Sequence, residues 1–145
     1  MPDEELIQFH FEEVDKITLN FIKYREWIIR IIKSEGFLPG FLNIIFTSDI
    51  CLHGINKEYL GKDYYTDVIA FDFSDEYNGK ISGDIFISKD RVADNAKQMN
   101  HSFEEELKRV IAHGILHLLG YKDSTKKLKE DMTNKENLYL KKYSP

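Results

Sequence analysis

The sequence is poor in several features that would place its 145 residues in a specialised class of protein. The single cysteine, Cys51, excludes a disulfide within the chain. No apolar run approaches the roughly 18 residues that a membrane-spanning helix needs. Only three prolines occur, and no low-complexity stretch or linker interrupts the chain, so we predict one domain over residues 1–145. These absences favour a cytoplasmic protein that has no membrane partner.

The chain also lacks an excess of basic residues. Its 20 lysines and arginines are outnumbered by 25 aspartates and glutamates, which gives a formal net charge of −5 at pH 7. A protein that binds nucleic acid through phosphates usually carries a basic surface. If this chain binds RNA, a local cluster of basic residues has to provide the phosphate contacts. One such cluster is Lys122 with the lysines at 126, 127 and 129. Simple solvation on an exposed helix is the alternative explanation for these lysines.

The sequence does contain an alternation of strand-like and helix-like segments. Four segments have the apolar or alternating pattern of strands, namely 7–11, 41–46, 67–73 and 81–87. Five segments have apolar residues at helical spacing, namely 24–35, 50–60, 88–100, 103–119 and about 124–141. We therefore predict an α/β (α+β) fold, in which helices pack on a mixed sheet of about four strands.

The most informative segment is His113-Gly-Ile-Leu-His117-Leu-Leu-Gly120-Tyr-Lys-Asp123. On a helix, a spacing of four residues brings two imidazoles to one face about one turn apart, where both can bind one divalent ion. Gly120 predicts the end of this helix, after which Asp123 can fold back as a third ligand. Three protein ligands leave a fourth position for water, as in catalytic metal sites. The helix is apolar around its second histidine, so we expect it to lie in the core.

Ordinary structural roles could explain the same residues. Two histidines four residues apart can be core residues that donate to carbonyls, and Asp123 can be the N-cap of the next helix. The zinc peptidases are a poor match, because their H-E-x-x-H motif has a glutamate as general base where this chain has Gly114. A metal-bound water could still be the nucleophile, with its base supplied from elsewhere.

The same segment resembles the H-G-x-L-H-L-x-G-Y-D-H signature of the YbeY family of bacterial metal-dependent endoribonucleases. The family's G-D-I strand is matched by residues 83–88. Its segment ending in P-T-D-V-L-S-F is matched by Leu52, Asn56, Tyr59, Lys62-Asp63, Thr66-Asp67-Val68 and Phe71. The resemblance implies a single-strand-specific endoribonuclease that acts in maturation of ribosomal RNA, at the 3′ end of the small-subunit RNA, and in ribosome quality control. It also implies an α/β fold with the metal helix in its core.

Three departures from the family pattern bear on the site. Asp123 stands where the family has its third histidine ligand; a carboxylate is an acceptable zinc ligand, but it favours ions that prefer oxygen. Leu60 replaces a common arginine, whose guanidinium could hold a phosphate bidentately. Tyr65 replaces the proline that usually precedes the threonine at 66. We expect the first change to preserve a metal site and the second to alter how the substrate is held.

Further polar residues are candidates for contact with an RNA substrate. They precede the third predicted strand or follow the second histidine: Lys62, Thr66, Asp67 and Lys122. Turn chemistry is the alternative role for the first three. Asp84 breaks the apolar pattern of the strand predicted at 81–87. It could orient a ligating histidine through the ring nitrogen that the metal leaves free, or it could face outward from a half-exposed strand.

The sequence thus predicts a metal-dependent endoribonuclease of ribosomal RNA, with His113 and His117 as catalytic residues. Together with Asp123 they would bind one Zn²⁺, or another divalent ion, that activates water or polarises a phosphate oxygen. Ribosomal proteins or the small ribosomal subunit would be further partners. One alternative is a non-catalytic ribosome-assembly factor with a structural zinc site, which Leu60 and the acidic charge favour. The other is a metal-dependent hydrolase of a small substrate.

Overall fold

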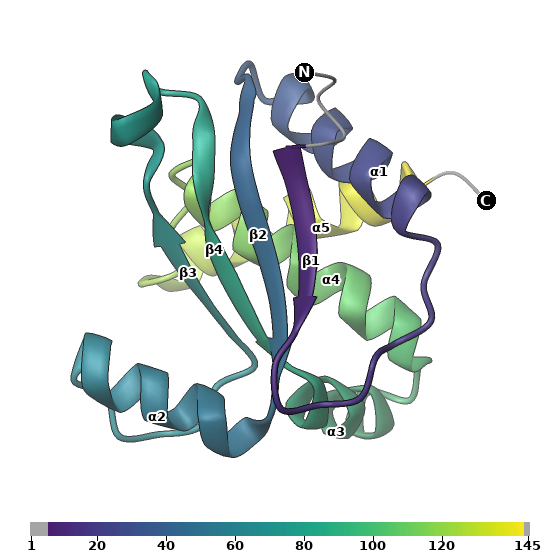
Figure 1. Cartoon of the computed structure of the whole chain (residues 1–145). Coiled ribbons are helices and arrows are strands. Elements are labelled where there is room, and N and C mark those ends of the chain that lie inside the picture. Colours follow the sequence, from purple (N-terminus) through teal and green to yellow (C-terminus); the bar gives the residue numbers. More distant parts are fainter. Residues whose placement is uncertain (1–5, 144–145) are drawn as a thin grey trace.

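A computed structural model describes residues 6–143 as a four-stranded sheet with five α-helices, which confirms the predicted fold class (Figure 1). The strands are β1 (Ile7–Phe11), β2 (Pro39–Thr47), β3 (Val68–Asp72) and β4 (Ile81–Ser88). The helices are α1 (Phe21–Ser34), α2 (Asp49–Leu60), α3 (Lys89–Met99), α4 (Phe103–Leu118) and α5 (Lys126–Lys141), with a 3₁₀ turn, η2, at Ser74–Tyr77. The predicted domain limits at 1 and 145 lie outside the described residues. Between residues 6 and 143, the helices are too short or too polar to cross a membrane.

The sheet is mixed, with the strand order β1-β2-β4-β3. β1, β2 and β4 are parallel, and β3 runs antiparallel to β4 at the edge opposite β1. The β3–β4 connection includes Asn78 and Gly79, which both have positive φ, at 57° and 77°. Asparagine and glycine adopt left-handed conformations at low cost, so this pair suits a turn between the two strands.

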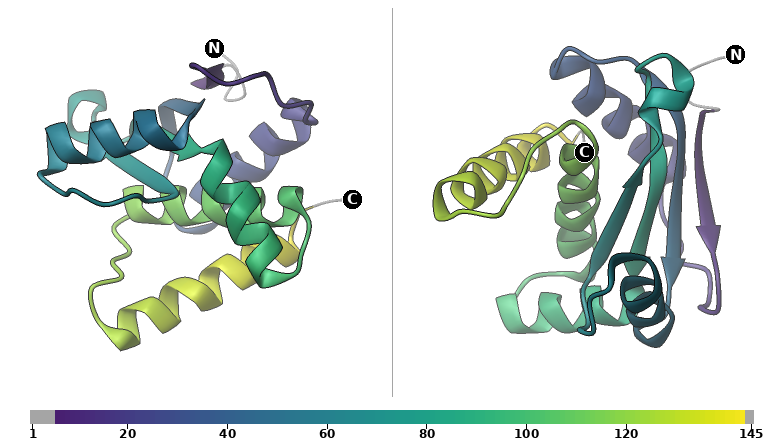
Figure 2. Two further views of the ribbon diagram at one scale, coloured as in Figure 1. Left: turned by 90° about the horizontal axis from the view of Figure 1, so that it is seen from below. Right: turned by 90° about the vertical axis from the view of Figure 1, so that its left-hand side faces the viewer.

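One face of the sheet carries the core. Phe9, Ile44, Ile85 and Ala70 lie in one row across the four strands and belong to, or pack against, the buried cluster. Helices α1 and α4 cover this face, and α5 packs on them from outside (Figure 2). The indole Nε1 of Trp27 in α1 donates to a carbonyl of α5 at 2.8 Å. The histidine helix α4 therefore lies in the core between the sheet and α5, as predicted.

Helix α4 approaches the sheet closely at Gly114. A Cβ atom at this position would lie 2.9 Å from Cγ2 of Ile85 in β4 and 3.4 Å from Cγ2 of Val68 in β3. The residue after the first histidine therefore faces the sheet, and there is no room for a side chain there. This packing explains why the chain lacks the glutamate of H-E-x-x-H, and it excludes the zinc-peptidase arrangement.

We expect the Gly114→Val substitution to lower the free energy of unfolding by about 2–3 kcal/mol, because the stiff Ile85 side chain cannot yield to an overpacked neighbour. Urea unfolding at pH 7 measures the change. Gly54 in α2 is the matched control, because a Cβ atom there would meet no atom within 4 Å. Gly54→Val should change stability by less than about 0.5 kcal/mol. Equal stability of the two variants would contradict the close approach of α4 to the sheet.

Candidate metal centre

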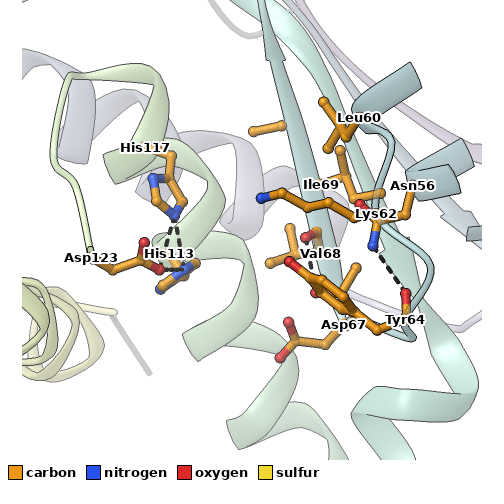
Figure 3. Close-up of a pocket in the computed structure, with 12 residues that line it drawn as sticks. Asn56, Leu60, Lys62, Tyr64, Asp67, Val68, Ile69, His113, His117 and Asp123 are labelled. Atoms are coloured by element: carbon orange, nitrogen blue, oxygen red, sulfur yellow. Dashed lines mark hydrogen bonds and ion pairs between the residues drawn. The ribbon is translucent and has the colours of Figure 1, made fainter. Parts of the chain in front are cut away.

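The last two turns of α4 and the loop that follows bring the three predicted ligands together (Figure 3). His113 and His117 lie on one face of the helix and are about one quarter to one third exposed, with side-chain exposures of 26% and 32%. Gly120, whose φ is +102°, reverses the chain after the helix. The reversal returns Asp123 to the histidines, as the position of the glycine predicts.

The ligand atoms are spaced for a single ion. The Nε2 atoms of His113 and His117 lie 3.0 Å apart, and Oδ2 of Asp123 lies 3.5 Å from each of them. Ligands about 2.0–2.2 Å from a tetrahedral zinc ion are separated from one another by roughly 3.4 Å. The three atoms are therefore close enough together to hold a single ion, and all three residues line the cavity described below. The group could hold a metal ion.

The hydrogen bond made by Nδ1 of each imidazole determines whether Nε2 of the same ring carries a proton or a free lone pair. Nδ1 of His113 lies 2.6 Å from Oε2 of Glu136, and Nδ1 of His117 lies 3.0 Å from the carbonyl oxygen of Tyr121. A carboxylate and a carbonyl both accept, so both Nδ1 atoms donate. Each neutral ring then has a lone pair on Nε2. Two lone pairs and a carboxylate oxygen meet at one point, and this arrangement calls for a cation between them.

Electrostatics distinguishes the two rings when no metal is bound. Burial alone would lower the pKa of His113, but the hydrogen bond and charge of Glu136 outweigh it and, with the charges of Asp67 and Asp123, raise this pKa above its ordinary value. Burial and the neighbouring His113 instead lower the pKa of His117. A proton on Nε2 of His113 can therefore point at Nε2 of His117. A bound metal ion would take the place of that proton.

Glu136 is a functional residue that sequence reasoning missed. It is 5% exposed, and it accepts hydrogen bonds from His113 and from Nη1 of Arg109, the latter at 3.2 Å. The signal lay in α5, whose buried residues are Met132, Glu136 and Tyr139 at helical spacing. A carboxylate in an otherwise uncharged buried stripe indicates a buried partner, because an unpaired charge there would be costly.

The role considered for Asp84 in orienting a histidine is wrong. Side chains alternate along a strand, and the neighbours of Asp84, Gly83 and Ile85, face α4. Asp84 therefore points to the opposite side of the sheet, where its carboxylate accepts from Nδ2 of Asn43 at 3.1 Å. The alternative stated for this residue, an outward position on a half-exposed strand, is the correct one.

The N-cap role considered for Asp123 is also excluded. Helix α5 begins at Lys126, and its cap is Thr125, whose hydroxyl accepts from the backbone N–H of Leu128 at 3.1 Å. The carboxylate of Asp123 instead faces the two histidines. The third ligand of the predicted site is thus positioned by the loop and not by capping.

A cavity of about 500 Å³ separates the histidines from β3 and from the loop before it (Figure 3). Three of the four residues predicted to contact substrate line this cavity: Lys62, Thr66 and Asp67. Leu60 lines it as well, while Lys122 does not and lies exposed in the loop before the third ligand. Its size is within the range of small-molecule sites, so one nucleotide with its flanking phosphates is a suitable occupant.

Asp67 is the second carboxyl group beside the metal donors. Burial raises its pKa, although the nearby His113 and backbone hydrogen bonds oppose the change. Nδ2 of Asn95 donates to its Oδ2 at 3.3 Å. A carboxyl whose pKa is raised can hold or accept a proton closer to neutral pH than an ordinary one can. Thr66 next to it also lines the cavity, and its hydroxyl makes a long local contact to the carbonyl oxygen of Val68 at 3.4 Å.

The loop that carries Asp123 is held in place by Glu35, the residue after α1. Oε1 of Glu35 accepts from the hydroxyl of Tyr121 at 2.6 Å, and Oε2 accepts from the hydroxyl of Tyr139 and from Nζ of Lys135, the latter at 3.1 Å. Burial would raise the pKa of Glu35, but these three hydrogen bonds lower it below its ordinary value of 4.5. The carbonyl of the same tyrosine at 121 fixes the ring of the second histidine, so Glu35 acts on the site through that residue.

We expect Tyr121→Phe to reduce the free energy of unfolding at pH 7 by about 1–2 kcal/mol, because a hydrogen bond to a charged group is lost. The folded-state pKa of Glu35 is depressed, so its contribution is complete above pH 4.5 and is lost as the pH falls through the lowered value. The difference between wild type and variant should therefore shrink in acid. Urea unfolding at a series of pH values between 3.5 and 7 measures it, and a difference that grows in acid would contradict the assignment.

Comparisons with known proteins show to which family the chain belongs. The model of the family described as "Endoribonuclease YbeY" matches residues 8–144. An endoribonuclease YbeY of Cytophaga hutchinsonii is 48% identical over 137 residues, which cover 94% of this chain and 95% of that protein. One of Flavobacterium johnsoniae is 48% identical over 132 residues, which cover 91% and 93%. The solution structure of a Thermotoga maritima protein is similar over 94% of this chain and 88% of that one, with a TM-score of 0.66 and 29% identity. The chain therefore belongs to the endoribonuclease YbeY family, as its motifs indicated.

Proposed function

We propose that this chain is a metal-dependent endoribonuclease that cleaves single-stranded regions of ribosomal RNA, with one zinc ion held by His113, His117 and Asp123. The observation that carries the proposal is the convergence of two Nε2 lone pairs and a carboxylate oxygen on the wall of a nucleotide-sized cavity. Membership of the family supplies the reaction, because its model and the curated relatives bear the name of an endoribonuclease.

The residues around the cavity divide the chemistry between them. When bound, the metal would lower the pKa of a water molecule and polarise a phosphate oxygen. Glu136 and the carbonyl of Tyr121 keep both imidazoles oriented toward the ion. Asp67, on the β3 side of the cavity, is placed to hold or move a proton during cleavage. Lys62 extends from the opposite wall toward the histidines, where its ammonium can balance the charge of a phosphate (Figure 3).

The metal, the RNA target, the partners and the cellular location in this proposal are supported by different observations. Two nitrogens and one oxygen suit zinc, although the carboxylate also allows ions that prefer oxygen. The 3′ end of the small-subunit RNA, ribosome quality control and ribosomal-protein partners rest on the motif resemblance. A substrate in ribosomes implies a cytoplasmic location. The short cavity supports action on unpaired RNA, whose bases can leave the stack.

The test is cleavage of a single-stranded oligonucleotide with the sequence of the 3′ region of the small-subunit RNA. The protein is stripped with a chelator and reloaded with zinc, manganese or magnesium. We expect internal cuts that require a metal and that disappear when the RNA is paired with its complement. One bound metal per chain without cleavage would favour the non-catalytic assembly factor. Equal cleavage of the duplex would show that single-strand specificity is wrong.

A further inference from the structure

The wall of the cavity that faces the metal donors is partly apolar. Leu60, at the end of α2, is 44% exposed, and Tyr64, in the loop that follows, is 54% exposed. Both line the cavity together with Val68 of β3. The leucine and the tyrosine lie on either side of Lys62 on this wall, where both are available to contact an apolar or flat group in the cavity (Figure 3). The question is therefore which chemical group covers them.

The backbone of Tyr64 is anchored to α2. Its carbonyl oxygen accepts from Nδ2 of Asn56 at 2.9 Å, and Asn56 is 2% exposed (Figure 3). The tyrosine ring extends from this anchor across the cavity toward His113, and the residue is 54% exposed (Figure 3). Within residues 6–143, no hydrogen bond engages its hydroxyl. The backbone beneath the ring is anchored, and an aromatic side chain has only two rotatable side-chain bonds, so stacking a flat group on it costs little conformational entropy.

Lys62 supplies the charge that belongs with such a ligand. Its ammonium points into the same cavity, between the tyrosine and the histidines (Figure 3). A ligand that spans this wall therefore needs a flat ring that can stack on Tyr64. It also needs an anionic group that can lie between Lys62 and the metal donors. A nucleotide of single-stranded RNA has this combination of a base and a phosphate.

We propose that this wall is a base-binding subsite, in which the unpaired base next to the scissile phosphate stacks on Tyr64 and packs against Leu60. The inference rests on the proposed function and adds the group that selects unpaired RNA. Base faces are covered in a duplex, so only an unstacked nucleotide can use the subsite. Stacking is also tolerant of sequence, because every base has a π-face. Leu60 cannot bind a phosphate as the arginine common in the family could. In this subsite it provides an apolar contact for the base instead.

The subsite would allow a chain with an acidic net charge to bind RNA without a large basic surface. A protein that binds RNA mainly through phosphates loses affinity steeply as salt is added. With a net charge of −5, this chain has few such contacts to offer. Stacking on an aromatic ring depends little on salt, so we expect the affinity for a short single-stranded RNA to change only weakly between 50 and 200 mM salt.

The experiment measures RNA binding and cleavage separately. Binding of a fluorescent single-stranded hexanucleotide to chelator-treated protein reports the dissociation constant without cleavage, and the metal-loaded protein gives kcat and KM. We expect Tyr64→Ala to raise both Kd and KM by at least about 5-fold, with kcat changed less than about 2-fold, because one stacking contact is lost. Tyr64→Phe keeps the ring and should remain within about 2-fold of wild type.

Tyr65 provides the matched control. It is the adjacent residue, is 48% exposed and does not line the cavity, and its ring packs against that of His53 at a tilt of 33°, with ring centroids 4.3 Å apart. Tyr65→Ala should therefore leave binding unchanged. Cleavage by the wild type with no change in Kd or KM on Tyr64→Ala would overturn the subsite alone, as would equal losses for the Ala and Phe variants at 64. No binding and no cleavage by the wild type would overturn the proposed function and the subsite with it.

Discussion

Replacing His117 by alanine is expected to reduce RNA cleavage by at least about 10³-fold, and to bring the metal content well below one ion per chain. The ion loses one of two nitrogen ligands, and the remaining imidazole and carboxylate cannot complete a tetrahedral site. The metal contributes several kcal/mol of transition-state stabilisation, and about 4 kcal/mol corresponds to this loss of rate. Elemental mass spectrometry and single-turnover cleavage of a labelled RNA measure the two effects on one preparation.

Three further variants make this result specific to the site. His10 lies on the opposite side of the sheet, where its Nε2 contacts Oδ1 of Asn43 at 2.8 Å, so His10→Ala should retain metal and activity. Asp123→Ala should lose the ion as His117→Ala does, because no cap or other contact replaces the ligand. Asp123→His restores a nitrogen donor and should bind zinc. Full metal content in folded Asp123→Ala would show that another residue completes the site.

Glu136→Gln is expected to weaken metal affinity by about 10–100-fold, as is usual when the hydrogen-bond partner of a ligating histidine is changed. The amide can still accept from Nδ1 of His113, but it lacks the charge that makes the imidazole a stronger ligand. Because the hydrogen bond and charge of Glu136 raise the pKa of His113, the variant should move that pKa down toward its ordinary value in the metal-free protein. Competition with a fluorescent zinc chelator gives the affinity, and NMR titration gives the pKa.

The matched control is Glu130→Gln, an exposed glutamate on the same helix. This control loses the same charge without touching the histidine, so it should change neither the affinity nor the pKa. A pKa of His113 that stays the same in Glu136→Gln would show that the buried glutamate serves only to pack α5. Unfolding in urea tests whether both variants remain folded, since Arg109 also loses its charged partner.

Local patterns were sufficient for much of the fold and for the three ligands. Hydrophobic periodicity found each strand and helix, because one face of every element has to be buried. The spacing of four residues predicted that His113 and His117 lie on one face of a helix, and Gly120 predicted where the chain reverses toward Asp123. All of these depend on residues near each other in the sequence, which is the range over which a pattern carries information.

Contacts between distant segments were not accessible in the same way. Glu136 meets a histidine 23 residues away, and Glu35 meets a tyrosine 86 residues away. Both contacts depend on how α1 and α5 pack against α4, and sequence spacing does not specify this packing. Asp84 illustrates the same limit within a single strand. Alternation along the strand defines two faces, but it does not indicate which face packs against the helix. Tyr64 belongs to an irregular loop, where no periodic pattern operates.

The position of α5 in the chain sets the order in which the centre can form. During translation, His113 and His117 leave the ribosome before Glu136, which orients the first of them, and before Lys135 and Tyr139, which hold Glu35. A nascent chain that has not yet made α5 contains the ligands without the groups that fix the imidazole at 113 and anchor the metal loop. The centre is therefore complete only after α5 has been synthesised and has packed against α4.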